Sequence, residues 1–336
     1  MPARLTAGPC RPKELPALRA LLNEVFIAER GASGDLFDYA PLLYSGANLA
    51  NLRVVRRGRE IVGHAGILER PIRWRGQMLR AGLIGGVCAR QELRGLGIGT
   101  LAMEDAAAHM GALGLDCGVL WTGSAGFYER LGWRHGGGIS IMRIIEAAEA
   151  GEIRHEILTL AESPFGPDDC HELHAAAGRH EVVRTVEETS LLMVGPGRDV
   201  LLALAGGRLV GYAAHDGSAV KEIEGDAAAC VSLLTEAARR GCRLCVFPLK
   251  DPRLAPIESA LPVEVQRRPL GMVLIVARAG LVAKLEAETG LSAVGLGVGL
   301  DLSDEAVLAR VFGDQSRQVA DAPLPLDIHI DYLDHV

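Results

Sequence analysis

Apolar residues follow two different spacings in the first 145 residues, and each spacing predicts a different kind of element. Between residues 12 and 27 they recur at every third or fourth position, which predicts a helix with one apolar face. The stretches 52–70 and 71–89 alternate, and they predict two hairpins that turn at 57–58 and near Gly76. Another helical period, then a strand, a short helix and a strand, complete a mixed α/β pattern.

The second half of the chain repeats much of this order, which indicates an internal duplication of one fold. A hairpin that turns at Gly206–Gly207 precedes a strand, a helix and further strands up to residue 278. In the tail we expect a helix, an alternating strand at 291–302 and a helix at 303–312. A charged connector near residue 150 separates the halves. We therefore predict an α/β protein with mixed sheets and three parts, at 1–148, 151–278 and 279–336.

Composition excludes several classes of protein. The net charge is -7 and no long basic run occurs, which argues against nucleic acid and anionic membranes as partners. The start of the chain has no apolar signal segment, and the longest apolar run, 271–283, is interrupted by Arg278 and too short to span a bilayer. Seven scattered cysteines are typical of reduced thiols in a cytoplasmic protein. The sequence is compatible with a homo-oligomer.

Three glycines stand between an apolar run and a predicted helix in the stretch "RGLGIG", residues 94–99. A glycine-rich turn that enters a helix exposes backbone N–H groups beside a positive dipole end, which suits a phosphate. A dinucleotide-binding fingerprint requires a different glycine spacing after the first strand of the unit, and a P-loop requires a lysine that Thr100 does not supply. Both of these nucleotide sites are therefore excluded.

The pattern Arg94-x-x-Gly97-x-Gly99 resembles the acetyl-CoA pyrophosphate loop of the GNAT N-acetyltransferase superfamily. The match extends upstream through "LIGGVCARQELRGLGIGTLAME" and downstream to "GSAGFYERLGW", which is similar to the family's "FYxxLGF" signature. The resemblance implies a GNAT fold for residues 1–148, acetyl-CoA as co-substrate and no metal. It also implies that backbone groups at one strand end pair with the pantetheine arm and that the loop cradles the pyrophosphate. Those residues are Val87 and Ala89 for the pantetheine, and Arg94, Gly95, Leu96, Gly97, Ile98, Gly99 and Thr100 for the phosphates.

Acetyl transfer to an amine needs a base for the amine and an acid for the leaving thiolate. The resemblance implies that Tyr128 is this acid. Many relatives place a base glutamate on the fourth strand, but "LRAGLIGGVCA" contains no carboxylate. His64 and Glu69, acting through water, and the C-terminal carboxylate are the alternatives.

The second half lacks a matching loop, because "EGDAAACVSLL" stands where the glycines would be. We interpret 151–278 as a degenerate GNAT-like domain that helps to shape the acceptor cleft. Such a tandem is similar to the enhanced intracellular survival acetyltransferases, which also use a terminal carboxylate as base. The parallel is partial, since the tail is shorter here. It implies that the carboxylate of Val336 reaches the first domain as a catalytic base.

The sequence therefore predicts an acetyl-CoA-dependent N-acetyltransferase that acts on a small-molecule amine by direct attack. The alternatives are a non-catalytic acyl-CoA sensor or scaffold, another acyl donor, and an O-acceptor. Other patterns are interpreted structurally. We expect a core role for Cys88 rather than nucleophilic catalysis, a solvated helical face for His171 and His174, and close sheet packing for "GLGVGL". Cys242 and Cys245 alternate on a strand, which disfavours a shared metal.

Overall fold

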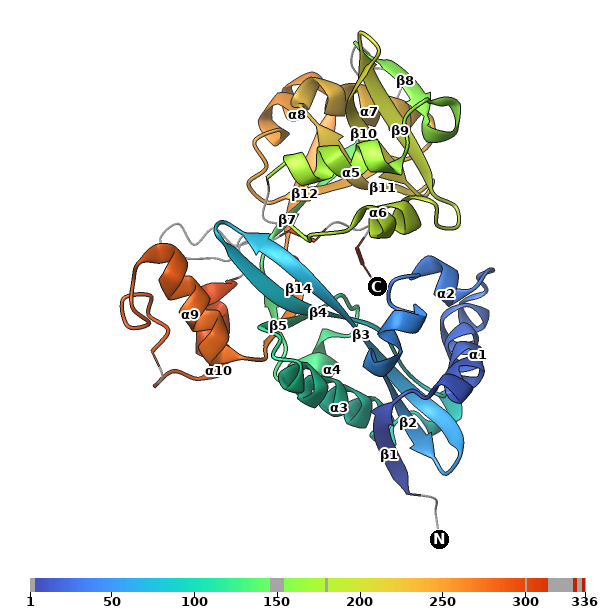
Figure 1. Ribbon diagram of the computed structural model, residues 1–336, viewed down its shortest axis with the longest axis vertical. Helices are drawn as coiled ribbons and strands as arrows, with labels where there is room; N and C mark the ends of the chain where they lie inside the picture. The colour runs from blue at the N-terminus through green and yellow to red at the C-terminus, as the bar shows by residue number, and fades with distance from the viewer. Residues whose placement is uncertain are drawn as a thin grey trace.

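The computed structural model describes residues 4–145, 154–178, 181–299, 301–313, 329–330 and 334–335, and these form two lobes around two seven-stranded sheets (Figure 1). The first half of the chain supplies β1 (Leu5–Pro9), η1 (Pro12–Glu14), α1 (Leu15–Phe26), η2 (Ala28–Arg30), α2 (Leu36–Tyr39), η3 (Gly46–Asn51), β2 (Leu52–Arg57), β3 (Glu60–Trp74), β4 (Gln77–Ala89), η4 (Gln91–Leu93), α3 (Ile98–Ala112), β5 (Cys117–Leu120), α4 (Ala125–Glu129), β6 (Arg134–Gly136) and β7 (Ile139–Ile144). The second half supplies β8 (Glu156–Thr159), η5 (Leu160–Glu162), α5 (Pro167–Ala176), α6 (Val186–Met193), β9 (Asp199–Ala205), β10 (Arg208–His215), β11 (Ala219–Gly225), α7 (Ala227–Arg239), β12 (Leu244–Pro248), α8 (Leu254–Ala260), β13 (Val263–Arg268), β14 (Gly271–Ile275), α9 (Arg278–Thr289) and α10 (Asp304–Val311).

The two sheets share one plan. Their strand orders are β1-β2-β3-β4-β5-β14-β6 and β13-β7-β12-β11-β10-β9-β8. Each sheet contains an antiparallel meander and one parallel pair, β4 with β5 in the first and β11 with β12 in the second. A helix makes the crossover in each case, α3 in the first lobe and α7 in the second, as parallel pairing requires. This repeat of strand order agrees with the predicted duplication.

The sheets exchange one strand. β14, from the second half of the chain, inserts between β5 and β6, and it pairs Met272 with Leu120 and Ile275 with Cys117. In return β7 lies between β12 and β13 of the second sheet. The predicted boundary near residue 150 therefore does not divide the two sheets. Any strand of suitable length and apolarity completes the backbone hydrogen bonds of a sheet, so its position in the chain does not decide its partner.

A long strand joins the lobes. The prediction placed 52–70 and 71–89 in separate hairpins, but β3 runs without a break through Pro71 to Trp74. Beyond the end of β2, the free edge of β3 pairs with a segment of the second half. There Val183 N donates to Pro71 O at 2.8 Å, and Arg73 N donates to Glu181 O at 2.9 Å. Pro71 is tolerated because only its carbonyl takes part in this short ladder.

Two further predictions of secondary structure differ from the observed elements. The expected strand at 291–302 is wrong, because Leu296 N bonds to Ser292 O and Gly297, with φ +66°, continues a set of turns. Alternation arises here from burial of Leu296 and Val298 rather than from strand geometry. Helix α6 was not predicted, although its N-cap Thr185 and Glu188 form the reciprocal capping box that marks a helix start.

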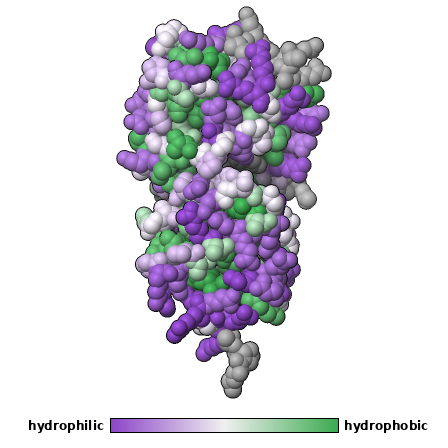
Figure 2. Space-filling model, turned by 90° about the vertical axis from the view of Figure 1, so that its right-hand side faces the viewer, coloured by the Kyte–Doolittle hydropathy of each residue, from purple (hydrophilic) through white to green (hydrophobic). Residues whose placement is uncertain are grey.

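The surface in Figure 2 is mostly hydrophilic, with apolar side chains in small separate groups. Buried aliphatic residues fill both faces of each sheet, and few aromatic residues contribute. Within the described ranges, none of the helices combines the length and the apolarity needed to cross a bilayer.

Candidate functional site

The glycine-rich stretch forms a tight turn directly before α3. Gly95 and Gly97 have φ values of +83° and +77°, a region that other residues rarely adopt, and Gly97 is the N-cap of the helix. The N–H groups of Ile98, Gly99 and Thr100 lie in the first helical turn, where no intrahelical acceptor is available. These groups and the helix dipole form a local anion site. Leu96 differs, because its N–H already donates to Leu93 O at 3.4 Å.

Arg94 precedes this turn and is paired within the protein. Its Nη2 lies 2.7 Å from Glu29 Oε2, and its Nε donates to Ala89 O at 3.3 Å. Nearly half of the side chain is exposed. An exposed ion pair of this kind is weak, so an anionic ligand can compete with Glu29 for the guanidinium. The predicted phosphate contact is therefore compatible with the position of Arg94.

The end of β4 carries a β-bulge that leaves one backbone edge open. Opposite Ala65 of β3 stand two residues, Gly86 and Val87, and Gly86 has a φ of +60°. A side chain at Gly86 would place its Cβ 2.2 Å from the Tyr44 hydroxyl, so glycine is required there. Arg90 N donates to Val62 O, which means that the backbone groups of Cys88, two residues earlier, also face β3. The backbone groups of Val87 and Ala89, which alternate with those of Cys88 and Arg90, therefore face away from β3, toward the other side of β4.

That other side is a cavity, because β4 and β5 pair only from Ala81 to Leu83 and then separate. The cavity has a volume of about 900 Å³. Val87, Ala89, Arg94, Gly99 and Tyr128 line it, so five of the residues predicted for the site lie around one space. Gly95, Leu96 and Gly97 form the turn, and Ile98 and Thr100 belong to the first turn of α3; these five do not line the cavity themselves, but they adjoin Arg94 and Gly99, which do.

Tyr128 belongs to the short helix α4 and is only 9% exposed. Its ring packs edge-on against Phe127 and Trp133, with centroids 4.8 and 6.5 Å away. Burial raises the pKa of Tyr128 above its ordinary value, against an opposing hydrogen bond with Thr122 that lowers it. The phenol is therefore protonated at neutral pH and able to donate a proton into the cavity.

The alternative bases of the first lobe are poorly suited. Burial lowers the pKa of His64 to about 4, and its Nδ1–H donates to Gly86 O at 2.8 Å, so the ring is neutral. Glu69 is held by Arg80 at 2.6 Å. Burial also raises the pKa of Cys88 to about 12, which agrees with the predicted core role for this thiol. Among the described residues that line the cavity there is no carboxylate.

The end of the chain reaches the wall of this cavity. The His335 ring stacks on Trp121, with centroids 3.6 Å apart and planes 25° apart, and Trp121 lines the cavity. The carboxylate of Val336 lies outside the described residues, and its assignment as base stays a prediction. Sequence reasoning missed Trp121, for which the only signal was its place directly after a buried strand.

The second lobe has no equivalent anion site at its crossover helix. The N-cap of α7 is Asp226, whose carboxylate accepts from Ala229 N at 2.8 Å. A negative side chain therefore occupies the place that a phosphate takes at a free helix N-terminus. This agrees with the expectation that "EGDAAACVSLL" does not cradle a pyrophosphate.

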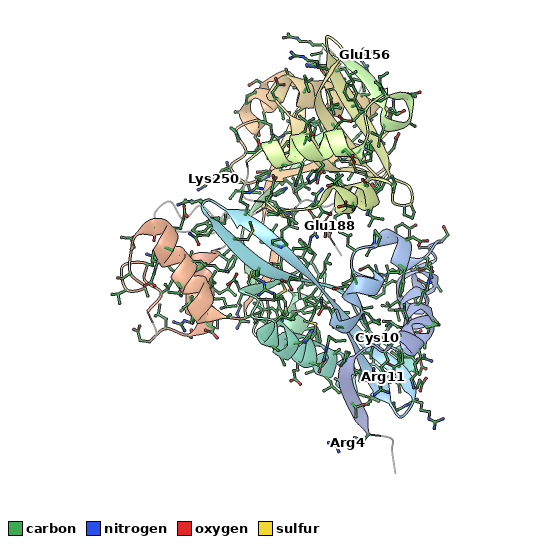
Figure 3. The ribbon with its side chains drawn as sticks, in the orientation of Figure 1. Arg4, Cys10, Arg11, Glu156, Glu188 and Lys250 are labelled. Carbon is green, nitrogen blue, oxygen red and sulfur yellow. The ribbon has the colours of Figure 1, made fainter. Side chains whose placement is uncertain are left out.

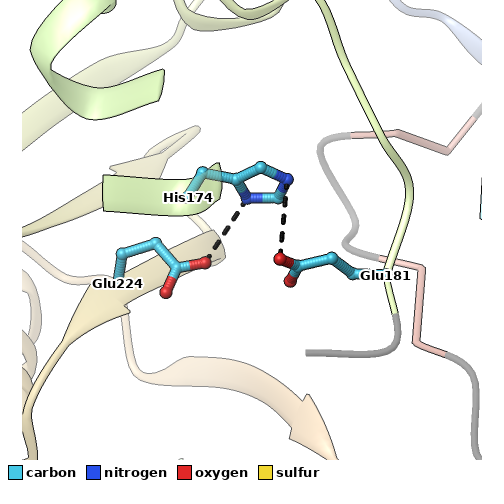
Figure 4. A group of neighbouring side chains, drawn as sticks. All are labelled: His174, Glu181 and Glu224. Carbon is cyan, nitrogen blue, oxygen red and sulfur yellow. Dashed lines mark ion pairs between the residues drawn. The ribbon is translucent and has the colours of Figure 1, made fainter. Parts of the chain in front are cut away.

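A buried ionic cluster lies in the second lobe, and it corrects the expected solvated position of His174 (Figure 4). This residue is 2% exposed, with Nδ1 3.4 Å from Glu224 and Nε2 4.0 Å from Glu181. These three side chains offer ligand atoms within 4.8 Å of one another. The two ring nitrogens face different carboxylates, however, and a single metal ion bonds only one of them. The arrangement suits a protonated imidazole better than a metal.

We expect His174 to make folding stability depend on pH in the alkaline range. Burial alone would lower the pKa of His174, but Glu222, Glu224 and Glu181 raise it to about 9 against the nearby Arg184. Its contribution is complete below the unfolded pKa of about 6.5 and is lost as the pH rises through 9, with an overall loss on the order of 2–3 kcal/mol. Urea unfolding of the His174→Gln variant between pH 6 and 9.5 should lack this decline, whereas the neighbouring His171→Gln should retain it. Parallel pH curves for wild type and His174→Gln would contradict the assignment.

Comparison with known proteins agrees with this geometry. Residues 8–136 match the model of the acetyltransferase (GNAT) domain family. No curated protein matches the sequence significantly.

Three solved structures are similar in fold. A protein from Enterococcus faecalis V583, described as a probable N-acyltransferase, has a TM-score of 0.64 and 16% identity, covering 84% of this chain and 74% of its own. A GCN5-related N-acetyltransferase from Kribbella flavida has a TM-score of 0.61 and 17% identity, with 84% and 73% covered. Eis1 from Mycobacterium abscessus has a TM-score of 0.58 and 14% identity, with 84% and 76% covered.

At such identities the structural likeness establishes the fold, and it extends over both lobes. The predicted mixed α/β GNAT fold is confirmed, as is the resemblance to tandem relatives. The family match itself rests on the first lobe, where the anion site and the open edge of β4 meet. We conclude that residues 8–136 are an acetyltransferase domain of the GNAT family.

Proposed function

We propose that this protein is an acetyl-CoA-dependent N-acetyltransferase that acts on a small primary amine by direct attack. The observation that carries the proposal is one cavity bounded by the α3 N-terminus, the open edge of β4 and the buried Tyr128 phenol. Backbone N–H groups from Gly97 to Thr100 bind the pyrophosphate, and Val87 and Ala89 pair with the pantetheine arm. The thioester carbonyl then lies toward Tyr128.

In the reaction, the neutral amine nitrogen attacks the thioester carbonyl and forms the new C–N bond. The C–S bond breaks, and Tyr128 gives its proton to the departing thiolate. The amine gives up one proton to a base, for which we propose the carboxylate of Val336. The stacking of His335 on Trp121 supports this choice, because it brings the preceding residue to the cavity wall. Deletion of the last two residues, His335 and Val336, should abolish turnover and preserve acetyl-CoA binding.

The test of the proposed function is release of free CoA thiol from acetyl-CoA across a panel of amines. The panel should contain aminoglycosides, polyamines, amino-acid derivatives and lysine peptides, with alcohols and other acyl-CoA donors as separate arms. Turnover with at least one amine supports the proposal. Tight acetyl-CoA binding with no thiol release from any acceptor would favour a non-catalytic acyl-CoA sensor instead.

Two variants test the anion site through their affinity for acetyl-CoA. Arg94→Glu should raise the Kd for acetyl-CoA at least roughly tenfold, because it replaces an attractive charge beside the phosphates with a repulsive one. Glu29→Gln removes the competing carboxylate, so it should leave the affinity unchanged or strengthen it. Isothermal titration with acetyl-CoA gives both values, and equal affinity of Arg94→Glu and wild type would refute the assigned loop.

A further inference from the structure

A buried carboxylate near the end of the chain is held by arginines of both lobes. Asp334 is 2% exposed. Its Oδ1 accepts from Arg70 Nη2 at 3.2 Å, and Arg70 belongs to β3 of the first sheet. Arg184, between α5 and α6, donates from Nε to both oxygens at 3.1 Å and from Nη2 to Oδ2 at 2.8 Å. This set of contacts, formed by Asp334, Arg70 and Arg184, is called the tail clamp below.

The two arginines are themselves fixed, so the tail clamp has a defined position. Arg70 Nη1 donates to Glu188 Oε1 of α6 at 2.5 Å. Figure 3 shows Glu188 where the lobes meet. Arg184 is fully buried and donates from both terminal nitrogens to Glu222 of β11, which also accepts from the Tyr212 hydroxyl. A planar guanidinium that makes several hydrogen bonds restrains the direction of its carboxylate partner.

The residue after the clamp touches the proposed active site. His335 stacks on Trp121, and the indole N–H of Trp121 donates to Leu270 O at 2.8 Å, which orients the ring. Trp121 belongs to the stretch Leu120–Ser124 of the cavity wall, which leads into the helix that carries Tyr128. One peptide unit therefore connects a buried ionic contact between the lobes with the wall of the cavity.

We propose that Asp334 is a positioning residue for acyl transfer, which sets the end of the chain against the cavity wall at Trp121. The proposal rests on the proposed function, because it assigns Asp334 a part in the same site. Asp334 touches no reacting atom, and it acts through His335 and the residue that follows. If the contact only joined the lobes, a substitution at Asp334 would change stability and not turnover. A substitution at any other residue of the cluster would then have the same effect.

The matched control for Asp334→Asn is Glu188→Gln. Both variants remove one negative charge from Arg70 and keep a similar shape, but only Asp334 belongs to the tail. A third variant, His335→Ala, releases the stacked ring at a half-buried position and leaves the ionic cluster intact. We would measure kcat, the KM of the amine, the Kd of acetyl-CoA and the tryptophan fluorescence of each. A protonated imidazole quenches the emission of an indole on which it stacks, so fluorescence recorded at mildly acidic pH reports whether His335 remains on Trp121.

We expect Asp334→Asn and His335→Ala to lower kcat by roughly tenfold to a hundredfold, the effect of a misplacement of about 1 Å. Both should raise tryptophan emission and leave the Kd of acetyl-CoA unchanged, whereas Glu188→Gln should match wild type in all four. The proposal is overturned if Asp334→Asn keeps wild-type kcat and emission, or if Glu188→Gln reproduces its effects. Should Asp334→Asn not fold, a wild-type kcat for His335→Ala overturns it.

The two proposals fail in different ways. If wild type releases no thiol with any acceptor, the proposed function fails, and the emission of the same variants still decides whether Asp334 places His335. If wild type turns over but Asp334→Asn is indistinguishable from it, the function stands and the positioning role is wrong.

Discussion

Tyr128→Phe is expected to lower kcat by roughly a hundredfold to a thousandfold, within the range that general acid catalysis contributes. The substitution removes only the hydroxyl, and the ring keeps its packing against Phe127 and Trp133. Without the phenol, the thiolate must leave without a proton from the protein. The Kd of acetyl-CoA should not change, because the loop and the β4 edge are intact.

The measurement is steady-state thiol release with the best amine of the panel, together with acetyl-CoA titration. Tyr39→Phe is the control, since Tyr39 is 41% exposed and does not line the cavity. Because burial raises the pKa of Tyr128, the acid form persists as the pH rises and is lost only above its ordinary range near 10. Activity should therefore show no loss from this group below pH 10. A kcat within threefold of wild type would remove Tyr128 from the mechanism.

Arg184→Met is expected to destabilise the protein by about 3–5 kcal/mol, the usual effect of removing one member of a buried ion pair. Arg184 is fully buried between Glu222 and Asp334, and the apolar replacement leaves two carboxylates without their common cation. The result should appear in urea unfolding as a lower midpoint with an unchanged slope.

Arg240→Met is the matched control, because Arg240 pairs with Glu236 on the surface and should contribute less than about 1 kcal/mol. The double variant Arg184→Met with Glu222→Gln should recover part of the loss, since it removes one of the uncompensated charges. A loss below about 1 kcal/mol for Arg184→Met would show that the cluster is not a major source of stability. Acetyl-CoA affinity, measured well below the unfolding midpoint, should be unaffected.

Local patterns in the sequence predicted the parts of the site that depend on short segments. Positive φ at Gly95 and Gly97 and free N–H groups at a helix start involve neighbouring residues only, so the string "RGLGIG" was sufficient to identify them. Tyr128 was proposed on different grounds, from the similarity of "GSAGFYERLGW" to the family's "FYxxLGF" signature. Similarly, the sequence showed that no Arg-x-x-Gly-x-Gly loop precedes α7, and there the Asp226 carboxylate caps the first turn of the helix.

Other features depend on residues far apart in the chain, and the sequence did not indicate them. The apolar run at β14 predicts a strand, but it does not say that Met272 pairs with Leu120 of the other lobe. His174 looked like a surface residue, because helical spacing does not show which face of α5 packs against Glu181 and Glu224 of the same lobe. Asp334 gave no local signal, and its partners Arg70 and Arg184 stand 264 and 150 residues away.

By itself, then, the sequence indicated the mixed α/β pattern and the glycine-rich turn before a helix, since both follow from periodicity and backbone geometry within a few residues. The GNAT fold and the candidate acid Tyr128 came from the resemblance of its motifs to that family. Only the tertiary structure decided which sheet each strand completes, which charges are buried together and where the end of the chain lies. A strand or a buried charge can pair with any complementary partner that folding brings near. The packing of the whole chain therefore decides which partner each one has.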